Sequence, residues 1–314
     1  MHFFSIFLAT IFTLVTLNAE NLFDTKHDEG KNDYEWLEES TRRWSPYRYW
    51  QKLNHTAQTI LACGEQGDSF VLPDLIALCE VENDSVMVDL TRRSILRNAG
   101  YDYVMTNSPD QRGIDVALLY SPLTFKLKYS RSHRIEPPKN LTPSRDVLEV
   151  CGTVANGKDL HIFVVHAPSR RNGKRSAYYR QLVFTRIAEV SDSIRAAEHD
   201  AQIVVTGDFN DVTGAPPLQL LEQHELEHVS KNATGKNGAR HTYQYRGVWY
   251  NFDNVFASHA LASRVSDCYV MDAPFLLEED TKWSGVRPKR NYYAFKWQNG
   301  YSDHLPLVTQ FVFE

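Results

Sequence analysis

Short apolar runs rich in β-branched residues, each bounded by Gly, Pro, Asn or Asp, constrain the fold of this chain more than any other feature. Their length and composition favour strands over helices. The expected strands are residues 12–17, 75–78, 116–120, 147–154, 160–165, 202–206, 254–257 and 305–313. A chain with so many short strands must build its core around sheets.

Three other stretches place apolar residues at helical spacing, which predicts amphipathic helices. They span residues 48–63, 84–99 and 176–198, and Gly64 and Gly100 are typical stops for the first two. Asp84 is a suitable N-cap for the second helix. Helices interspersed with short strands indicate an α/β layered domain.

Composition sets limits on size and class. The chain has 314 residues, 42% of them hydrophobic, so it can bury a substantial core, and no linker-like segment divides it into two domains. A formal charge of -5 argues against a surface that is basic all over. The cysteines lie far apart without C-x-x-C spacing, so neither a zinc knuckle nor a disulfide framework is indicated.

The N-terminus is apolar. Residues 3–17 resemble the hydrophobic region of a signal peptide and are too short to span a membrane, but no Lys or Arg precedes them. Because residues 12–17 are an expected strand, we expect residues 1–11 to be a vestigial signal or a disordered N-terminus before a single domain over residues 12–314. This N-terminus favours an exported location, periplasmic or secreted, over a cytoplasmic one.

Side chains able to bind a metal or move a proton stand at the ends of the expected strands. Four strands run into such groups: Asn18 after 13–17, Glu80 after 75–78, His166 after 162–165, and Asp208 with Asn210 after 203–205. Two strands follow them instead: 254–257 after Asp253, and 305–313 after Asp303 and His304. If these last strands run antiparallel to the others, all six ends meet at one edge, where sheets place their ligands.

Each of these residues has a structural explanation when taken alone. Asn and Asp are common turn formers, and a single His can be a hydrogen-bonded core residue. Their convergence carries the functional interpretation. Carboxylates of Glu80 and Asp303 and the amide carbonyl of Asn18 suit Mg²⁺, whereas no Cys or multi-His cluster suits zinc.

The order of the motifs is similar to that of a known family. The runs LNAENLFD, LCEVEN, RGIDVALLY, PSRDVLEV, VVHAPSR, TGDFND, NFDNVF and YSDHLPL occur in that order between about residues 16 and 307. They resemble the endonuclease/exonuclease/phosphatase family, which includes DNase I-like nucleases, apurinic-site endonucleases, inositol-phosphate phosphatases and neutral sphingomyelinases. The resemblance implies a four-layer α/β sandwich, with two packed mixed β-sheets flanked by helices.

The resemblance also implies roles. Asn18 and Glu80 would bind a divalent metal, expected to be Mg²⁺ with Mn²⁺ or Ca²⁺ as alternatives, and Asp303 would lie near it or join the acid/base network. The other roles are as follows: Asp208 contacts the attacking water, Asn210 holds water and phosphate, His304 meets the phosphate, Asp253 orients His304, and His166 is the second histidine of DNase I-like members. His166 favours that branch over the apurinic endonucleases.

Phosphate contacts and partner carboxylates are less well fixed by the motifs. Arg145 resembles a phosphate-contacting Arg of the DNase I-like branch, and Asp115 is the nearest candidate partner for His166, although a structural role for Asp115 is equally supported. Arg170 begins a basic cluster with Arg171, Lys174 and Arg175 that either faces substrate phosphate or is solvated loop charge.

A second basic run, Arg287, Lys289 and Arg290, lies in a segment rich in charge and aromatics. We interpret residues 273–298 as a long ordered excursion beside the site. The aromatic side chains of residues 283–301 are better interpreted as packed than as a platform for stacking bases.

These observations predict a metal-dependent hydrolase of phosphoester bonds. A nuclease acting on phosphodiesters is preferred, because of the DNase I-like histidine and the basic run after it. The alternatives are a phosphoesterase on a small or lipid phosphoester, like a sphingomyelinase or an inositol phosphatase, and a non-catalytic binding protein on the same scaffold. The expected partner is a nucleic acid or other phosphoester substrate, with no obligate protein partner and a monomeric state.

Overall fold

The computed structural model describes residues 10–66 and 69–313, and these form two six-stranded sheets. The first sheet has the order β15 (Val265–Val270), β20 (Leu307–Phe313), β1 (Thr10–Leu22), β4 (Leu75–Val81), β6 (Asp115–Tyr120) and β5 (Asp102–Met105). The second has the order β11 (Leu226–His228), β14 (Asp253–Ser258), β10 (Gln202–Asp208), β9 (Asp159–His166), β8 (Val147–Thr153) and β7 (Lys126–His133). Both sheets are mixed, because each contains parallel and antiparallel neighbours.

The remaining elements are helices and short hairpins. The α-helices of the described residues are α1 (Pro46–Ala62), α2 (Asp84–Val88), α3 (Lys174–Ala197), α4 (Pro216–Gln223) and α5 (His259–Ala262). The hairpins are β2 (Glu65–Gln66) with β3 (Ser69–Phe70), β12 (Tyr243–Tyr245) with β13 (Val248–Tyr250), β16 (Leu277–Glu279) with β17 (Val286–Pro288), and β18 (Tyr292–Tyr293) with β19 (Lys296–Trp297). Single turns of other helices are η1 (Tyr34–Trp36), η2 (Asp89–Arg93), η3 (Ile95–Asn98), η4 (Arg170–Asn172) and η5 (Pro274–Leu276).

The alternation of side chains along the strands builds four layers. On β1, Leu14 points into a core shared with Val204 of the second sheet, whereas its neighbour Val15 points to the opposite face. That outer face packs on α1 through residues such as Leu53 and Ile60. Three separate apolar layers therefore lie between four structural layers.

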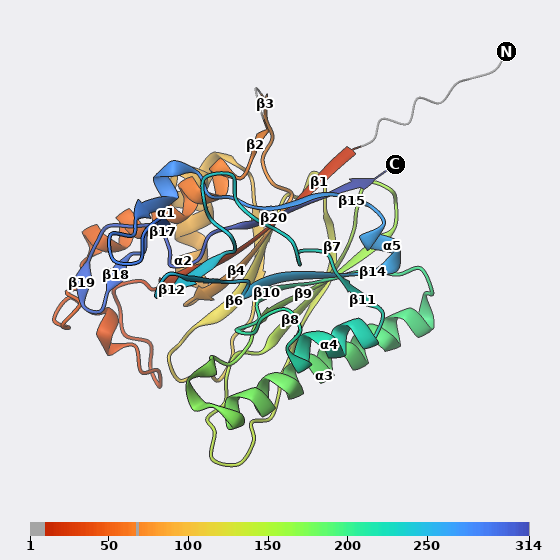
Figure 1. The fold of residues 1–314 in the computed structure, drawn as a ribbon, viewed down its shortest axis with the longest axis horizontal. Coiled ribbons are helices and arrows are strands. Elements are labelled where there is room, and N and C mark those ends of the chain that lie inside the picture. The colour runs from red at the N-terminus through yellow and green to blue at the C-terminus, as the bar shows by residue number, and fades with distance from the viewer. Residues whose placement is uncertain (1–9, 67–68, 314) are drawn as a thin grey trace.

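Helices cover the outer face of the second sheet as well. Val183 and Phe184 of α3 pack with Leu221 of α4 against this sheet. Figure 1 shows α1 and α2 on one side of the paired sheets and α3 and α4 on the other. The expected four-layer α/β sandwich, with two packed mixed β-sheets flanked by helices, is confirmed.

The expected strands are present with small shifts of their ends. β1 begins at Thr10, so the boundary expected at residue 12 is two residues late, while residues 1–9 and any signal there lie outside the described residues. The last strand starts at Leu307 because Pro306 has no N–H to donate to a neighbouring strand. The cysteines are all free thiols.

The helix expected over residues 84–99 is wrong as a continuous element. Only the single turn α2 is α-helical there, followed by η2 and η3. Ser94 interrupts the helix with an extended backbone, ψ -172°, and its hydroxyl accepts a hydrogen bond from the Leu96 N–H at 3.0 Å. Ser competes with helical hydrogen bonding in this way, and apolar spacing alone did not reveal it. Within the described residues, no helix has the length and apolar character needed to cross a bilayer.

The strand directions bring the polar ends together. β9 and β10 are parallel, and their register places His166 beside Asp208. β14 runs antiparallel to β10 with Asp253 opposite Asp208, and β20 runs antiparallel to β1. The strands that follow Asp253 and His304 therefore run antiparallel to their neighbours, which is the condition for all six strand ends to meet at one edge.

Gly207 makes this close approach feasible, and its replacement tests how tightly β9 and β10 pack at the site. Its φ is +134°, and a Cβ atom there would lie 1.9 Å from the carbonyl oxygen of Val165. We expect Gly207→Ala to lower the free energy of unfolding by about 3 kcal/mol or more, because backbone on both strands must shift. Urea unfolding measures the change.

Gly157→Ala is the matched control, because Gly157 also has a positive φ, +74°, but nothing lies within 4 Å of its added Cβ. We expect it to lose about 1 kcal/mol from backbone strain alone. Equal losses in the two variants would contradict the close packing at Gly207.

Candidate active site

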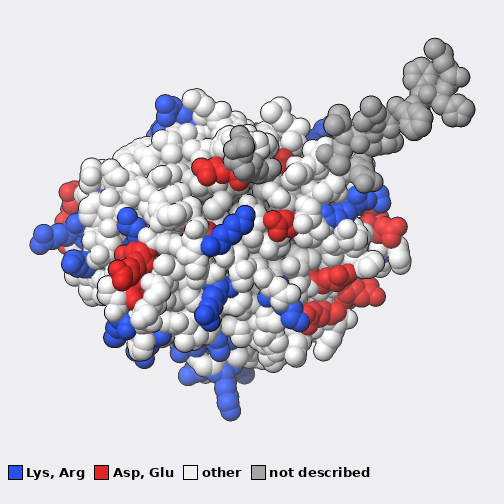
Figure 2. Space-filling view, turned by 45° about the horizontal axis from the view of Figure 1, so that its top comes forward, with Lys and Arg blue, Asp and Glu red and all other residues white. Residues whose placement is uncertain are grey.

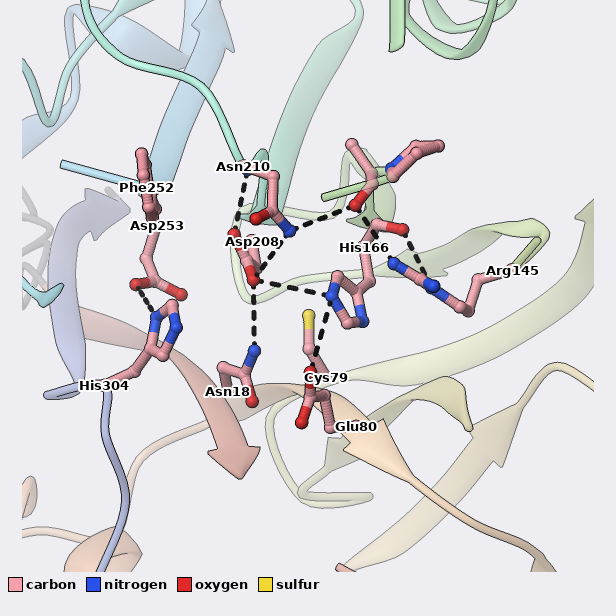
Figure 3. Close-up of polar contacts among 12 residues, drawn as sticks. Asn18, Cys79, Glu80, Arg145, His166, Asp208, Asn210, Phe252, Asp253 and His304 are labelled. Atoms are coloured by element: carbon pink, nitrogen blue, oxygen red, sulfur yellow. Dashed lines mark hydrogen bonds and ion pairs between the residues drawn. The ribbon is translucent and has the colours of Figure 1, made fainter. Parts of the chain in front are cut away.

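The candidate site lies where the two sheets meet at one end of the sandwich. Asn18 and Glu80 come from β1 and β4 of the first sheet, and His166 and Asp208 come from β9 and β10 of the second. Figure 3 shows their side chains pointing toward one another around Asp208. The residues predicted from four separate strands therefore form one cluster.

Asp208 is the buried centre of this cluster. Its Oδ1 accepts a hydrogen bond from the Asn210 backbone N–H at 2.9 Å, and its Oδ2 accepts from Asn210 Nδ2 and Asn18 Nδ2, both at 3.1 Å. Burial raises the pKa of Asp208 to about 7, with the charge of Asp253 adding to the effect and that of His304 opposing it. Asp208 can therefore exchange a proton near neutral pH.

Asn210 is committed to Asp208 in this arrangement. Its Nδ2 donates to Asp208 Oδ2 and also to the Ala167 carbonyl at 3.1 Å, which uses both amide hydrogens. The side chain can offer only Oδ1, an acceptor, to a ligand. That suits the expected contact with water, but a phosphate oxygen would need a donor.

His304 forms an ion pair with Asp253 beside Asp208. The His304 Nδ1 lies 2.6 Å from Asp253 Oδ2, which also accepts a hydrogen bond from the Thr242 hydroxyl at 2.6 Å. Burial alone would lower the pKa of His304, but the negative charges of Asp253 and Asp208 raise it to about 10. His304 is therefore an imidazolium at neutral pH, held in orientation by Asp253 as expected.

His166 is the opposite case. Its Nε2 lies 3.5 Å from Asp208 Oδ2 and 3.7 Å from Glu80 Oε1, and its Nδ1 is buried without a partner. Burial, together with the positive charge of Arg145, lowers the pKa of His166 well below its ordinary value. A neutral ring with its proton on Nε2 fits these surroundings, because that nitrogen faces two carboxylates.

Asp115 is not the partner of His166, so that candidate pairing is wrong. Its Oδ1 accepts hydrogen bonds from the Thr106 hydroxyl and, at 3.0 Å, from the Ser108 N–H. These bonds tie the loop after β5 to β6. The structural role is the one that the hydrogen bonds of Asp115 support.

The oxygen atoms that could bind a metal belong to Glu80, Asn18 and Asp303. Glu80 Oε2 accepts from the Asn21 N–H at 2.9 Å, whereas Oε1 receives no hydrogen bond and lies 3.8 Å from Arg112. Asn18 Oδ1 accepts one hydrogen bond, from the Glu20 N–H at 2.9 Å, which leaves its second lone pair, and Asp303 pairs through Oδ2 with Arg290 at 2.8 Å. Among the described residues no three His, Cys, Asp or Glu side chains are placed to hold a metal together. This sparse oxygen set fits Mg²⁺, which needs only one or two carboxylates besides water and phosphate oxygens.

The two arginines expected to contact substrate differ in their surroundings. Arg145 is buried, and it donates to the carbonyls of His166 and Ala167 at 3.2 and 3.0 Å and to Asp110 at 3.0 Å. It supports the loop that carries His166, and a contact with phosphate stays a prediction. Arg170 is exposed in η4, four residues after His166.

A charged network beside Asp303 was missed by sequence reasoning. Arg290 faces Asp303 and Glu20, with its Nε 3.4 Å from Glu20 Oε1, and the buried Lys52 donates to the Tyr301 carbonyl. Burial raises the pKa of Glu20 to about 7, with Asp303 adding to the effect, and burial lowers the pKa of Lys52. The position of Glu20 in the LNAENLFD run was the available signal, but no pattern marked Lys52.

Strained backbone gathers at the same place. Glu20, Asn21, Glu80 and Asn210 all have left-handed φ values, between 49° and 62°. Such conformations are unfavourable for residues other than Gly, and they are commonly found at functional sites. These four residues lie in β1 and β4 and just after β10, on the strands that carry the site.

Comparison with known proteins places this geometry in a family. A family model described as "Endonuclease/Exonuclease/phosphatase family" matches residues 13–312. The chain belongs to this family. Its members are phosphoesterases that typically depend on a divalent metal. No curated protein sequence matches the chain significantly.

Several solved structures share this fold. A Bacteroides thetaiotaomicron protein of the family has a TM-score of 0.62 at 15% identity, over 98% of this chain and 99% of that chain. A mannosyl-6-phosphatase from the same organism has a TM-score of 0.63 at 16% identity, over 96% and 100%. Truncated Caenorhabditis elegans TDP2 has a TM-score of 0.58 at 16% identity, over 96% and 97%. At this identity the likeness shows the fold alone.

The Asp253–His304 pair generates a prediction about protonation. Asp253→Asn removes the carboxylate that raises the pKa of His304 most and leaves His304 buried, so we expect this pKa to fall well below about 10. NMR titration of ¹⁵N-labelled histidine in metal-free protein measures it. The wild-type pair contributes stability below pH 6.5 that is lost as the pH rises toward 10.

Asp115→Asn is the matched control, because it also removes a buried carboxylate but one bound to Thr106 and Ser108. We expect it to leave the His304 titration unchanged. A His304 pKa that stays high in Asp253→Asn would contradict the assignment of Asp253 as the source of the shift.

Proposed function

We propose that this protein is a divalent-metal-dependent nuclease that hydrolyses phosphodiester bonds. The observation that carries the proposal is a buried carboxylate beside a held histidine: Asp208 lies opposite Asp253 on the neighbouring strand, and Asp253 Oδ2 lies 2.6 Å from Nδ1 of the His304 imidazolium. A proton acceptor next to a fixed cation is the pair of groups that attack of water on a phosphate requires. His166 and the basic run after it support a nuclease over other phosphoesterases.

The residues act in distinct ways. Asp208, held by Asn18 and Asn210, would orient the attacking water and accept its proton, with Asn210 Oδ1 as a second acceptor for that water. The His304 imidazolium would stabilise negative charge on a non-bridging oxygen in the transition state. Asp253 is a positioning residue, since it holds the His304 ring.

His166 is assigned to hydrogen bonding rather than to proton donation. Its depressed pKa keeps the ring neutral, so it is poorly suited to protonate a leaving oxygen. As a neutral donor at Nε2 it would contact an oxygen of the substrate. Because His166 is buried next to Asp208, that contact would lie close to the attacking water.

A bound Mg²⁺ would offset the charge of the phosphate and polarise it. Glu80 and Asn18 would hold the ion, with Asp303 beside it. Glu80 is suited to this because Oε1 receives no hydrogen bond while Oε2 is fixed by the Asn21 N–H. Mn²⁺ or Ca²⁺ would meet the same oxygen atoms.

A phosphoesterase acting on a small or lipid phosphoester is the second candidate. Arg290 favours it, because a guanidinium paired with Asp303, the neighbour of His304 in sequence, suits a phosphate that carries an extra charge. A non-catalytic binding protein is disfavoured, because burying Asp208, Asp253 and Glu20 together is costly without a function.

Hydrolysis by the purified protein tests the proposal directly. We expect cleavage of plasmid DNA or RNA with Mg²⁺ and none with EDTA, because the phosphate charge must be offset before attack. A parallel panel of sphingomyelin and phosphomonoesters separates the second candidate. Metal-independent activity, or no activity on any substrate, would overturn the proposal.

Variants of the two central groups test the mechanism. We expect Asp208→Ala and His304→Ala each to lower kcat by about 10³-fold or more, through loss of the proton acceptor or of transition-state charge stabilisation. Steady-state kinetics on the cleaved substrate measure this. Circular dichroism checks that each variant folds.

His259→Ala is the matched control for His304→Ala. His259 follows the end of β14 opposite to Asp253, and its side chain is 89% exposed. We expect its kcat to match the wild type. Near-normal activity of Asp208→Ala or His304→Ala would refute the roles assigned to them.

A further inference from the structure

An exposed group of cations lies beside the active site, and no other part of the described structure neutralises it. We call Arg170, Arg171, Lys174 and Arg175 the α3 basic patch; they lie in η4 and the first turn of α3, and all are exposed. Their side chains form no hydrogen bond or ion pair with another described residue. Most other arginines in the described chain are paired, as Arg180 is with Asp211.

The local structure does not explain positive charge at the N-terminal end of α3. The N-terminal end of a helix carries positive partial charge, so cations there are unfavourable. α3 has no acidic residue in its first turn, and its N-cap, Gly173, has no side chain to accept a hydrogen bond. α2 shows the usual arrangement, with Asn83 as a hydrogen-bonding N-cap and Asp84 in the first turn. The patch therefore opposes, rather than supports, the start of its own helix.

The patch is fixed relative to the catalytic residues. Arg180, two turns into α3, donates from Nε to Asp211 at 2.9 Å and from Nη1 to the Pro168 carbonyl at 3.1 Å. Asp211 follows the Asp208 motif, and Pro168 follows His166, so one buried arginine ties α3 to both catalytic loops. Arg170 is four residues from His166, which places it within about 14 Å even if the chain is extended.

Positive charge is concentrated at the end of the molecule where α3 begins. Figure 2 shows Lys and Arg side chains gathered along the lower edge of the view, below the acidic groups, and Figure 1 shows α3 beginning at that end of the molecule. The whole chain has a formal charge of -5, so the local excess of positive charge is not a general property of the surface.

We propose that the α3 basic patch binds backbone phosphates of a polynucleotide strand to one side of the scissile bond. This inference rests on the proposed nuclease function and names where the strand runs. Successive phosphates advance about 3.4 Å along a strand, so Arg170 reaches phosphates within about four nucleotides of the cleaved bond.

The experiment measures binding without hydrolysis. Fluorescence anisotropy with labelled single-stranded oligonucleotides of about 2, 4, 8 and 12 nucleotides, in EDTA, covers lengths below and above the expected reach. The test variant is Arg171→Ala/Lys174→Ala. The matched control is Lys126→Ala/Lys158→Ala, which removes two exposed cations from the opposite end of the same sheet.

For the wild type and the control, we expect affinity to rise with length up to about 8 nucleotides. For the patch variant, we expect about tenfold weaker binding of the longer strands and a slope of log K against log[salt] that is smaller by about 1.4, because about 0.7 is lost per single-strand phosphate contact. Binding of the shortest oligonucleotide should differ little among the three proteins.

Two results would overturn the proposal. One is equal length dependence and salt slope in the patch variant and the control. The other is patch-dependent binding to anionic phosphatidylserine vesicles in place of oligonucleotides, which would assign the surface to a membrane. Because binding is measured without metal, these outcomes are separate from the hydrolysis panel, whose failure would refute the nuclease itself.

Discussion

The contact between the two sheets at Asn18 and Asp208 is the constraint on which the site depends. Asn18 Nδ2 of β1 donates to Asp208 Oδ2 of β10 at 3.1 Å, and two residues earlier the hydroxyls of Thr16 and Thr206 meet across the same interface. Most of the remaining contact between the sheets is apolar, and apolar contacts are not directional. Directional hydrogen bonds fix the register of one sheet on the other. Every distance between a residue of the first sheet and one of the second follows from that register.

Burial then gives the charged residues their chemistry. Asp208, Asp253 and His304 share a volume with little water, so each carboxylate raises the pKa of the imidazole and burial raises that of Asp208. His166, at the other side of Asp208, lies 3.5 Å from that carboxylate, and burial together with the charge of Arg145 lowers its pKa. The two histidines thus differ in charge because Asp253 lies only 2.6 Å from the ring of His304, whereas no carboxylate lies that close to His166. Charge pairing also applies to Glu20 and Lys52, which lie close to Arg290 and Asp303. There each buried charge has a neighbour of opposite charge, which offsets the cost of burial.

Much of this arrangement was predictable, for a physical reason. Strands show themselves through composition and turn residues, and a polar side chain directly after a buried strand must lie at a sheet edge, so Glu80, His166 and Asp208 were found from position alone. Pairings across the fold were not predictable. Asp115 looked like a partner for His166, but it serves the loop at Ser108, and Lys52 faces inward from a helix whose pattern only indicates amphipathicity. Ser94 ended a helix by a local hydrogen bond that apolar periodicity cannot register.

Four residues of the site have a left-handed backbone: Glu20, Asn21, Glu80 and Asn210. This conformation lowers the stability of the fold, although the site needs residues other than glycine there. Glycine at any of these positions would relieve the strain, and at Glu20, Glu80 and Asn210 it would also remove a side chain that the cluster uses. Selection for thermal stability alone would therefore replace these strained residues first, and the site would lose its side chains. In a homologue that keeps the fold but has lost the function of the site, we expect glycine at these positions before any substitution in the apolar layers.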